Sequence, residues 1–531
     1  MKWVAAAIRN GALLGLALLM LLSIPLAASY SKTFLQKRRL QMNLLGSAGE
    51  TEAKDRTVPV ILIGQVNGVH RDNLSGSLDR GNWFMPDNRL IRLNGKPGTN
   101  TVFLAYENHL VSAEIELIEG TESTVTLDAG LAPDVPDLLI IKSSGTADFI
   151  FKLPVQNAEK ITLENAPDGV SIKKIDGQFE ISIPQKHLQK NFISFSVLST
   201  NEFGTSKTYV GITSPAPEPL IEIRTPEEFS KIRNNLTANY LLMNDLDFSA
   251  IDNWVPIGSN EFPFSGVFDG NGFEIKGFHL IDPAFESGSF SLFGACKNAV
   301  IRNTTLRDAY IEVQNLGNET ECFSALSHTM HQSFAENNAV VGGKITAGNG
   351  GASGMFCSFE KSIFRDLFNS ADVFSSIKER VMRNTGGIVG GGSGYITRCA
   401  NEGTISGRHL TGGIIGWGSD VFLSHCINSG QIYGQPLVGE FPPGAIIQTV
   451  DAGIIHSSLF LRGSAERGGS LFGEGVINEI NVIEPGQLKD PAALDLLGSF
   501  EGDSAQWEFT EKNASGPIPK GIFRRSESDE R

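Results

Sequence analysis

The chain has 531 residues, of which 58 are glycine, and its formal net charge at pH 7 is −15. This length allows two to four domains, and a glycine content above the usual ~7 %, together with little helical periodicity, indicates an all-β protein rich in turns. The acidic charge argues against a nucleic acid partner, because binding to phosphate without sequence preference needs an excess of Lys and Arg.

Residues 1–29 have the features of an export signal. Lys2 and Arg9 precede an apolar run at 11–29, and the Ala-Ala-Ser sequence at 27–29 offers a cleavage site. No later segment is apolar over 18 residues, so membrane contact is expected only through this segment, if it is not cleaved. The expected location is extracytoplasmic, either secreted or at the cell surface.

The same region resembles the N-terminal helix of minor type IV pilins. Residues 9–43 carry a Gly before the apolar run and a TxLQxRR stretch after it, although Leu16 stands where major pilins have Glu. The resemblance implies a retained membrane helix at 11–30 in a protein associated with the inner membrane or a pilus. Signal peptide and N-terminal membrane helix both remain open as interpretations of residues 1–29.

Two small β domains are expected after a linker at 30–56. Over 57–132, short alternating runs separated by Asn-Gly, Pro-Gly and Glu-Gly turns predict an antiparallel β-sandwich. Over 133–215, the strand order and the motifs APDGVSI, GQFEISIP and STNEFGTS resemble the immunoglobulin-like (Ig-like) modules of bacterial surface proteins. That resemblance implies a spacer that holds a further domain away from an anchor, followed by a Pro-rich hinge at 214–219.

Residues 216–510 contain internal repeats. The two best copies are TGGIVGGGSGYITRCANEGTISG at 385–407 and TGGIIGWGSDVFLSHCINSGQIYG at 411–434. One copy cannot bury its short apolar runs alone, whereas stacked copies can, by pairing equivalent strands ~4.8 Å apart. We therefore expect a right-handed β-helix (β-solenoid), preceded by the two small β-sandwich domains.

The block at 220–280 carries a more specific resemblance. It contains YLLMNDLDFS, WVPIG and FSGVFDGNGFEIKG, and the motifs SLFG, GGIVG and GGIIG follow at 291–294, 386–390 and 412–416. This pattern resembles the GLUG-motif family of bacterial exported proteins, which implies a GLUG-type β-helix over 216–510. Two copies, SALS and SGMFC, depart from the motif, which puts their turn geometry in doubt.

Helices are expected to cap both ends of the repeats. Thr225, Pro226 and Glu228 form a capping-box pattern, and the short helix that they begin would cover the open first rung. The dipeptide at 490–491 would begin the helix at the far end. Residues 511–531 are expected to be a disordered tail.

The five cysteines are Cys296, Cys322, Cys357, Cys399 and Cys426. Their odd number leaves at least one unpaired, and no CxxC pair or suitably spaced His completes a zinc site. We expect them to be buried as small apolar residues, with Cys399 and Cys426 stacked inside the repeats.

Two acidic stretches could hold a cation but are better explained by local structure. Asp269 in FSGVFDGNGFEIKGF begins an EF-hand-like spacing, yet Phe273 and Leu280 stand where such a loop needs oxygen ligands. Asp-Gly and Asn-Gly therefore predict a turn. Asp245 and Asp247 lie on one face of a strand and are predicted to form a polar strand edge rather than an acid/base pair. No metal and no cofactor is expected.

A β-helix can also carry a polysaccharide-active enzyme, which needs carboxylates on one face of successive coils. No repeat position holds an acid in three successive copies, and no HExxH, GxSxG or phosphate-loop motif occurs. Arg398 and His425 stand at nearly equivalent places and are predicted to face solvent. No catalytic residue is therefore assigned.

The remaining candidates for contact with a ligand are aromatic. Trp417, between two glycines, is expected to be exposed, while Tyr433 and Tyr395 could lie either on the surface or in the core. The sequence thus predicts an exported, non-enzymatic surface protein, adhesin-like or structural, whose partner is an extracellular glycan or a surface protein. A pilus-associated minor pilin with a β-helix tip and a glycan-active enzyme are the alternatives.

Overall fold

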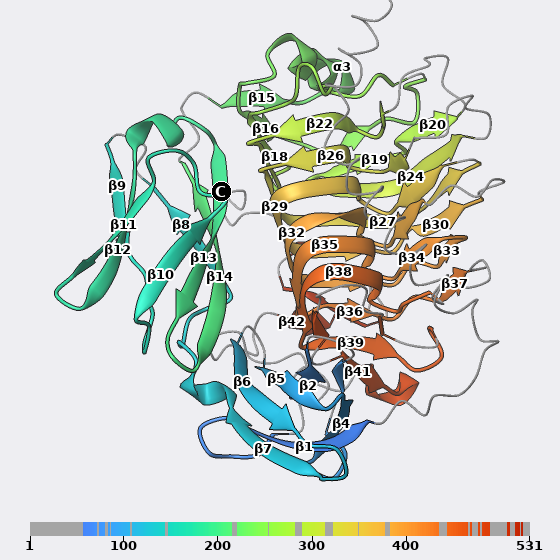
Figure 1. Ribbon diagram of the computed structural model, residues 1–531. Helices are drawn as coiled ribbons and strands as arrows, with labels where there is room; N and C mark the ends of the chain where they lie inside the picture. The colour runs from blue at the N-terminus through green and yellow to red at the C-terminus, as the bar shows by residue number, and fades with distance from the viewer. Residues whose placement is uncertain are drawn as a thin grey trace, which may run out of the picture. The chain divides into compact units, whose positions relative to one another are not determined.

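The computed structural model describes residues 57–523, except 72–73, 80–82, 85, 107–108, 144–146, 215–219, 253, 282–288, 314–321, 349, 377–382, 435–442, 466–467, 470–475, 478–479, 489–506, 510–515 and 521. The signal or membrane segment at 1–29, the linker at 30–56, most of the hinge and the helix start at 490–491 lie outside these residues. The described part is all-β with one long parallel sheet (Figure 1), and it contains no helix long and apolar enough to cross a membrane.

The first β unit comprises residues 57–132. Its elements are β1 (Val58–Gln65), β2 (Ser75–Leu78), β3 (Trp83–Phe84), β4 (Ile91–Gly95), β5 (Gly98–Tyr106), β6 (His109–Leu117), β7 (Ser123–Asp128) and the 3-10 helix η1 (Ala129–Leu131). Alternate residues of β1 point inward, so Val58, Val60 and Leu62 are buried. β1 pairs with β4 in antiparallel but with β7 in parallel, which departs from the antiparallel expectation.

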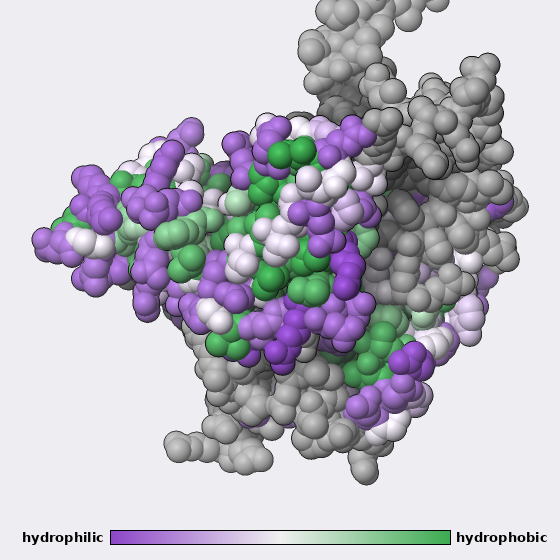
Figure 2. All heavy atoms as spheres, turned by 60° about the horizontal axis from the view of Figure 1, so that its bottom comes forward, coloured by the Kyte–Doolittle hydropathy of each residue, from purple (hydrophilic) through white to green (hydrophobic). Residues whose placement is uncertain are grey.

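The first unit also exposes apolar side chains. Figure 2 shows hydrophobic residues lying between hydrophilic ones on the face turned toward the viewer. The exposed large apolar residues of this unit are Val69, Phe84, Ile118 and Leu131.

The second β unit comprises residues 133–213. Its elements are β8 (Leu138–Lys142), β9 (Phe149–Lys152), β10 (Lys160–Glu164), β11 (Ser171–Ile175), β12 (Gln178–Ile183), the 3-10 helix η2 (Gln185–His187), β13 (Phe192–Thr200) and β14 (Gly204–Thr213). β9, β11 and β12 form one sheet, while β8, β10, β13 and β14 belong to another. β14 also pairs with β6, where Gly204 lies opposite Val111, so this second sheet continues into the first unit.

The remaining strands belong mainly to the long parallel sheet. They are β15 (Ile221–Ile223), β16 (Tyr240–Leu242), β17 (Leu246–Asp247), β18 (Val267–Asp269), β19 (Glu274–Lys276), β20 (His279–Ile281), β22 (Phe293–Lys297), β23 (Val300–Arg302), β24 (Thr305–Val313), β26 (Ser327–His331), β27 (Phe334–Ala347), β29 (Phe356–Asn369), β30 (Asp372–Ser375), β32 (Val389–Asn401), β33 (Ile405–Gly407), β35 (Ile415–Ser424), β36 (Ile427–Asn428), β37 (Ile432–Gly434), β38 (Ile447–His456), β39 (Ser458–Leu461), β40 (Val476–Ile477) and β41 (Ile480–Ile483). A smaller parallel sheet contains β21 (Ser289–Phe290), β25 (Cys322–Ser324), β28 (Gly351–Ser353), β31 (Asn384–Gly386) and β34 (Leu410–Gly412).

Equivalent positions of successive repeats stack in register. One column consists of Phe293, Ser327, Phe356, Val389, Ile415 and Ile447. The degenerate copies SALS and SGMF keep this register, and the column adds a copy, GAII at 444–447, that the repeat pattern did not reveal. Because each strand pairs with its equivalent in the next repeat, the sequence repeat becomes a spatial one.

Three buried asparagines form a hydrogen-bonded ladder between repeats. Nδ2 of Asn369 donates to Oδ1 of Asn401 over 2.8 Å, and Nδ2 of Asn401 donates to Oδ1 of Asn428 over 2.7 Å. Each Nδ2 also donates to a backbone carbonyl two residues ahead. A Cβ at Gly387 would lie 2.4 Å from Cγ of Asn401, so this motif glycine is required for space.

The predicted cap at the first rung is confirmed. Oγ1 of Thr225 accepts a hydrogen bond from the backbone N of Glu228 at the start of α3 (Pro226–Ser230), which continues as the 3-10 helix η3 (Lys231–Asn234). Phe229 of α3 is 0 % exposed. Its ring packs on a cluster formed by Phe248, Trp254, Phe268 and Phe293.

An apolar column also runs along the outside of the parallel sheet. It consists of Val267, Val300, Phe334, Ile363, Tyr395, Phe422 and Ile454. Leu138, Phe192 and Tyr209 of the second β unit pack against it, with the rings of Tyr209 and Tyr395 5.3 Å apart. The second unit therefore packs along the sheet (Figure 1), where it covers the apolar outer column.

A second outer column is covered by the C-terminal segment. β42 (Trp507–Phe509) and β43 (Pro517–Pro519) pair in antiparallel, and Ile518 and Ile522 are 0 % and 2 % exposed. They pack in one cluster with Phe368, Ala400, Ile427 and Leu459. The prediction of a disordered tail over 511–531 is therefore wrong for the described residues 516–520 and 522–523, because these cover apolar surface.

Candidate functional site

A groove of about 550 Å³ lies where β30, β33 and β37 end. Its lining includes Ser375, Ser376, Ser406, Arg408, Ile432 and Tyr433. These residues come from three successive repeats, so the groove crosses several rungs. Hydroxyl, guanidinium and aromatic groups line it together.

The in-register pairing of the three strands builds this groove. Phe374 of β30 pairs with Ser406 of β33, which pairs with Tyr433 of β37, and all three alternate with buried residues, so they face outward. Gly407 follows Ser406, and Gly434 follows Tyr433. A Cβ at Gly434 would lie 2.2 Å from Cγ of Pro443. Gly434 is therefore required for the close approach of Pro443, which also lines the groove.

The three aromatic residues proposed from sequence occupy different environments. Tyr433 is 56 % exposed and lines the groove, whereas Trp417 is half-buried. Tyr395 is 0 % exposed and its hydroxyl lies 3.0 Å from Oγ of Ser424, so it is a core residue and not ligand-facing. Burial raises the pKa of Tyr395 well above its usual value. Ser406 and Arg408 were not proposed from sequence. A signal for Ser406 was present, because TISG at 404–407 ends one repeat as QIYG at 431–434, which contains Tyr433, ends the next.

Arg398 and His425 are buried, contrary to the prediction that they face solvent. Both have positive φ, 51° and 54°, which turns the chain and redirects the side chain. The Arg398 guanidinium makes a two-pronged ion pair with Asp366, with Nε 2.6 Å from Oδ1 and Nη2 2.6 Å from Oδ2. This ion pair joins β29 and β32, which are neighbours in the parallel sheet.

Histidines gather at the boundary between the second β unit and the parallel sheet. Nε2 of His456 lies 3.1 Å from Oδ2 of Asp137, and the ring of His425 lies 5.6 Å from that of His456. Burial lowers the pKa of His425 to about 3, with the neighbouring His456 acting in the same direction. Burial also lowers the pKa of His109, whose Nδ1 lies 2.8 Å from Oγ of Ser206. His109 and His425 are therefore neutral at pH 7.

The acidic stretches have local structural roles, as predicted. Oδ1 of Asp269 accepts from the backbone N of Asn271 at the turn between β18 and β19, and Oδ2 pairs with Arg302. Asp245 accepts from the backbone N of Glu274 and pairs with a lysine, while Asp247 accepts from the backbone N of Ser249. Among the residues that the structure describes, no group of three or more His, Cys, Asp or Glu could hold a metal ion.

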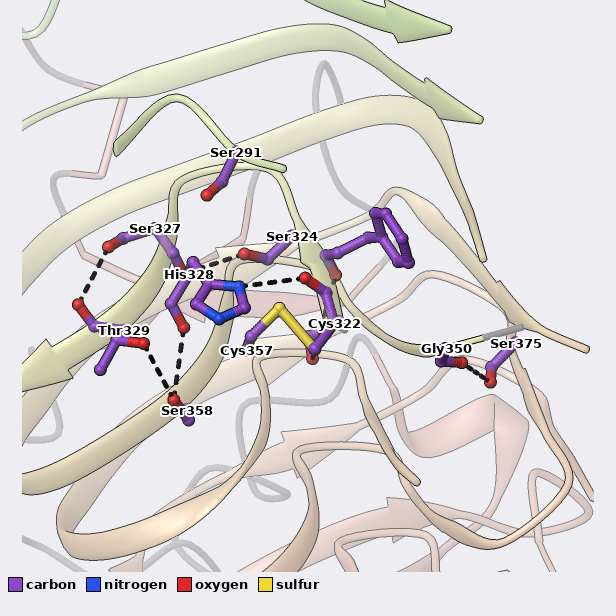
Figure 3. The surroundings of a disulfide bond; sticks show 12 residues. Ser291, Cys322, Ser324, Ser327, His328, Thr329, Gly350, Cys357, Ser358 and Ser375 are labelled. Atoms are coloured by element: carbon purple, nitrogen blue, oxygen red, sulfur yellow. Dashed lines mark hydrogen bonds between the residues drawn. A yellow bond between two sulfur atoms is a disulfide. The ribbon is translucent and has the colours of Figure 1, made fainter. Parts of the chain in front are cut away.

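Cys322 and Cys357 form a disulfide between two successive repeats (Figure 3). The expectation that all five cysteines are buried as small apolar residues is therefore wrong for this pair. Cys399 and Cys426 are 0 % exposed and stack as predicted, since the residues that follow them, Ala400 and Ile427, pair in register. Burial raises the pKa of the Cys296 thiol to about 12. The sequence could not reveal the pair, because the structure brings together residues 35 positions apart.

His328 lies beside the disulfide in Figure 3. Its Nδ1 is 3.1 Å from the carbonyl oxygen of Cys322, and burial lowers the pKa of the imidazole. Serines surround the pair, and Oγ of Ser358 donates to the carbonyl of His328. The contacts hold the two repeats in register.

Comparison with known proteins gives little guidance. No protein-family model matches the chain. A "Putative Gly-rich membrane protein" of Evansella cellulosilytica is 28 % identical over 131 residues, which are 23 % of this chain and 15 % of that protein.

Solved structures match weakly. An endo-fucoidan hydrolase from glycoside hydrolase family 107 is 16 % identical, with a TM-score of 0.16 over 32 % of this chain and 30 % of that chain. A chimeric titin Z1Z2-Z1Z2 tandem is 15 % identical, with a TM-score of 0.15 over 27 % of this chain and 84 % of that chain. At these TM-scores neither match carries an argument, and the resemblance to GLUG-motif proteins stays a prediction.

Proposed function

We propose that the protein is exported and acts as a non-enzymatic surface protein that displays a GLUG-type, right-handed β-helix for binding an extracellular glycan or protein. The parallel sheet would be this β-helix, and the second β unit an Ig-like sandwich. The in-register columns support the first assignment. The second is supported by one apolar cluster between two sheets, to which β12, β13 and β14 contribute.

The observation that carries the proposal of export is the disulfide between Cys322 and Cys357. Structural disulfides form and persist in oxidising compartments and are rare in the cytosol. The bond agrees with the export signal expected at 1–29. Two independent features of the chain therefore favour the same compartment.

The pairing of charged side chains supports a scaffold rather than an enzyme. Arg307 pairs with Glu274 over 2.5 Å, and Arg302 pairs with Asp269 over 2.8 Å, each between successive rungs. A carboxylate held by a guanidinium favours its ionised form and stabilises neighbouring strands. The groove at Tyr433, lined by hydroxyl, guanidinium and aromatic groups, is better suited to binding.

The test is the mature N-terminus and thiol content of the native protein. We expect mass spectrometry of the surface or secreted fraction to find a start near Ser29 or Tyr30. Alkylation in denaturant without reductant should label the three thiols of Cys296, Cys399 and Cys426. A full-length cytosolic protein with five reactive thiols would contradict the proposal, and a start at Ala12 in a filament fraction would favour the minor pilin.

A further inference from the structure

We propose that the groove beside Tyr433 binds a polysaccharide, with the sugar chain lying across the rungs along the flank of the parallel sheet. This inference deepens the proposed function, because it gives the displayed surface a ligand class. It is carried by two observations: the aromatic positions on successive rungs and the fixed hydroxyls beside them.

The aromatic side chains have the spacing that a repeating ligand requires. Phe374, Ser406 and Tyr433 occupy equivalent positions on successive rungs. Two strand steps of ~4.8 Å separate the aromatic positions by ~9.6 Å. A pyranose ring presents C–H groups on one face that pack on an aromatic ring, so one sugar would pack on Tyr433 in the groove, and an alternate sugar of an extended chain would reach Phe374, which does not line the groove. Ser406 leaves room for the sugar between them.

The polar groups beside these aromatic positions can bind the edges of the sugar rings. Oγ of Ser375 donates to the carbonyl oxygen of Gly350 over 2.6 Å, and Oγ of Ser376 donates to that of Gly348 over 3.1 Å. Each oxygen is thereby oriented and keeps acceptor capacity for a sugar hydroxyl. Arg408 lines the same groove and brings a guanidinium group. Such fixed groups lose little conformational entropy on binding.

The flank also carries positive charge that could bind an anionic sugar. Nζ of Lys344 lies 5.1 Å from the centroid of the Phe374 ring. Lys344 lies on the rung before that of Phe374, and Arg408 follows β33, the rung of Ser406. Lys344 and Arg408 would donate hydrogen bonds to a neutral polysaccharide and form ion pairs with the carboxylates of a uronate polysaccharide. The experiment below distinguishes the neutral from the anionic polysaccharide.

The test is affinity electrophoresis of the full chain in native gels. The gels contain hydroxyethylcellulose, xylan or dextran as neutral polymers, or alginate as the anionic one. The variant is Tyr433→Ala, which removes an exposed ring without opening the core. The matched control is Phe262→Ala, because Phe262 is another exposed aromatic residue, at 63 %, and does not line the groove.

We expect at least one polymer to retard the native protein. Tyr433→Ala should bind that polymer roughly tenfold more weakly, while Phe262→Ala is unchanged. Retardation by alginate alone would assign the anionic class, and retardation by a neutral polymer the neutral class. No retardation by any of the four polymers, or equal retardation of native protein and Tyr433→Ala, would overturn the inference.

The outcome is separable from that of the proposed function. If the native protein binds through Tyr433 but is found in the cytosol, export fails and the groove stands. If the protein is exported but unretarded, the groove fails and export stands.

Discussion

Replacing Asn401 by Leu tests the asparagine ladder. Leu has nearly the same size but cannot hydrogen-bond, so the carbonyl of Gly403 and Oδ1 of Asn428 each lose a donor. Nδ2 of Asn369 loses one of its two acceptors. At about 1–3 kcal/mol for each of these three buried polar groups, the expected loss of unfolding free energy is roughly 3–9 kcal/mol.

The same change at the end of the ladder should cost less. Asn428→Leu removes the partner of the Gly430 carbonyl and one of the two acceptors of Asn401. At the same ~1–3 kcal/mol for each of two groups, the loss is about 2–6 kcal/mol. The double variant should lose at least ~1 kcal/mol less unfolding free energy than the two single variants added together. Each single variant leaves the other asparagine without its hydrogen-bond partner, whereas the double variant removes both asparagines.

Urea unfolding of the full chain with its disulfide intact, followed by far-UV circular dichroism, measures these differences. The midpoint should fall in the order native, Asn428→Leu, Asn401→Leu. An end variant as destabilising as the middle one, or strictly additive losses, would refute the assignment of a cooperative ladder.

Three further predictions concern buried groups. His425→Asn, which tolerates the positive φ, should reduce the acid sensitivity of folding. With its pKa lowered from 6.5 to about 3, native His425 contributes its full stability above pH 6.5 and loses ~1.4 kcal/mol per pH unit as the pH falls toward 3. The difference between the urea midpoints at pH 7 and pH 5 measures this acid sensitivity. A difference as large for His425→Asn as for the native protein would contradict the prediction. Asp366→Asn should cost about 3–5 kcal/mol, because it leaves the buried Arg398 guanidinium without its countercharge; replacing both residues by apolar ones should cost less, and thermal melts would rank the variants. Replacing Cys322 and Cys357 by Ser should cost up to ~4 kcal/mol through the freed loop, so a double variant as stable as the native protein would argue against the bond.

Local signals in the sequence predicted local structure well. Asn271 and Gly272 have φ of 52° and 73°, as the Asn-Gly dipeptide indicates, and Thr225 caps its helix. The repeats predicted stacking of equivalent residues, since each strand is defined by its own short apolar run. These features depend on neighbours in the chain, and a sequence contains them directly.

Features that depend on distant contacts could not be predicted in this way. Tyr395 lies on the outer face of its strand and is buried only because Tyr209 and Phe192, far away in the chain, cover it. Arg398 and His425 follow strand residues, but their positive φ interrupts the alternation of inward and outward side chains. The groove could be predicted only in part: Tyr433 was a candidate, whereas Ser376 and Arg408 come from the ends of other rungs.

The covered outer column limits how this protein can change. A repeat array usually tolerates the gain or loss of a unit, because each unit contacts only its neighbours. Here an added rung between Phe334 and Phe422 would displace every later residue of the column relative to Phe192 and Tyr209. The second β unit therefore fixes the number of rungs that it covers. Natural variation in the number of repeats should be confined to rungs that it does not contact.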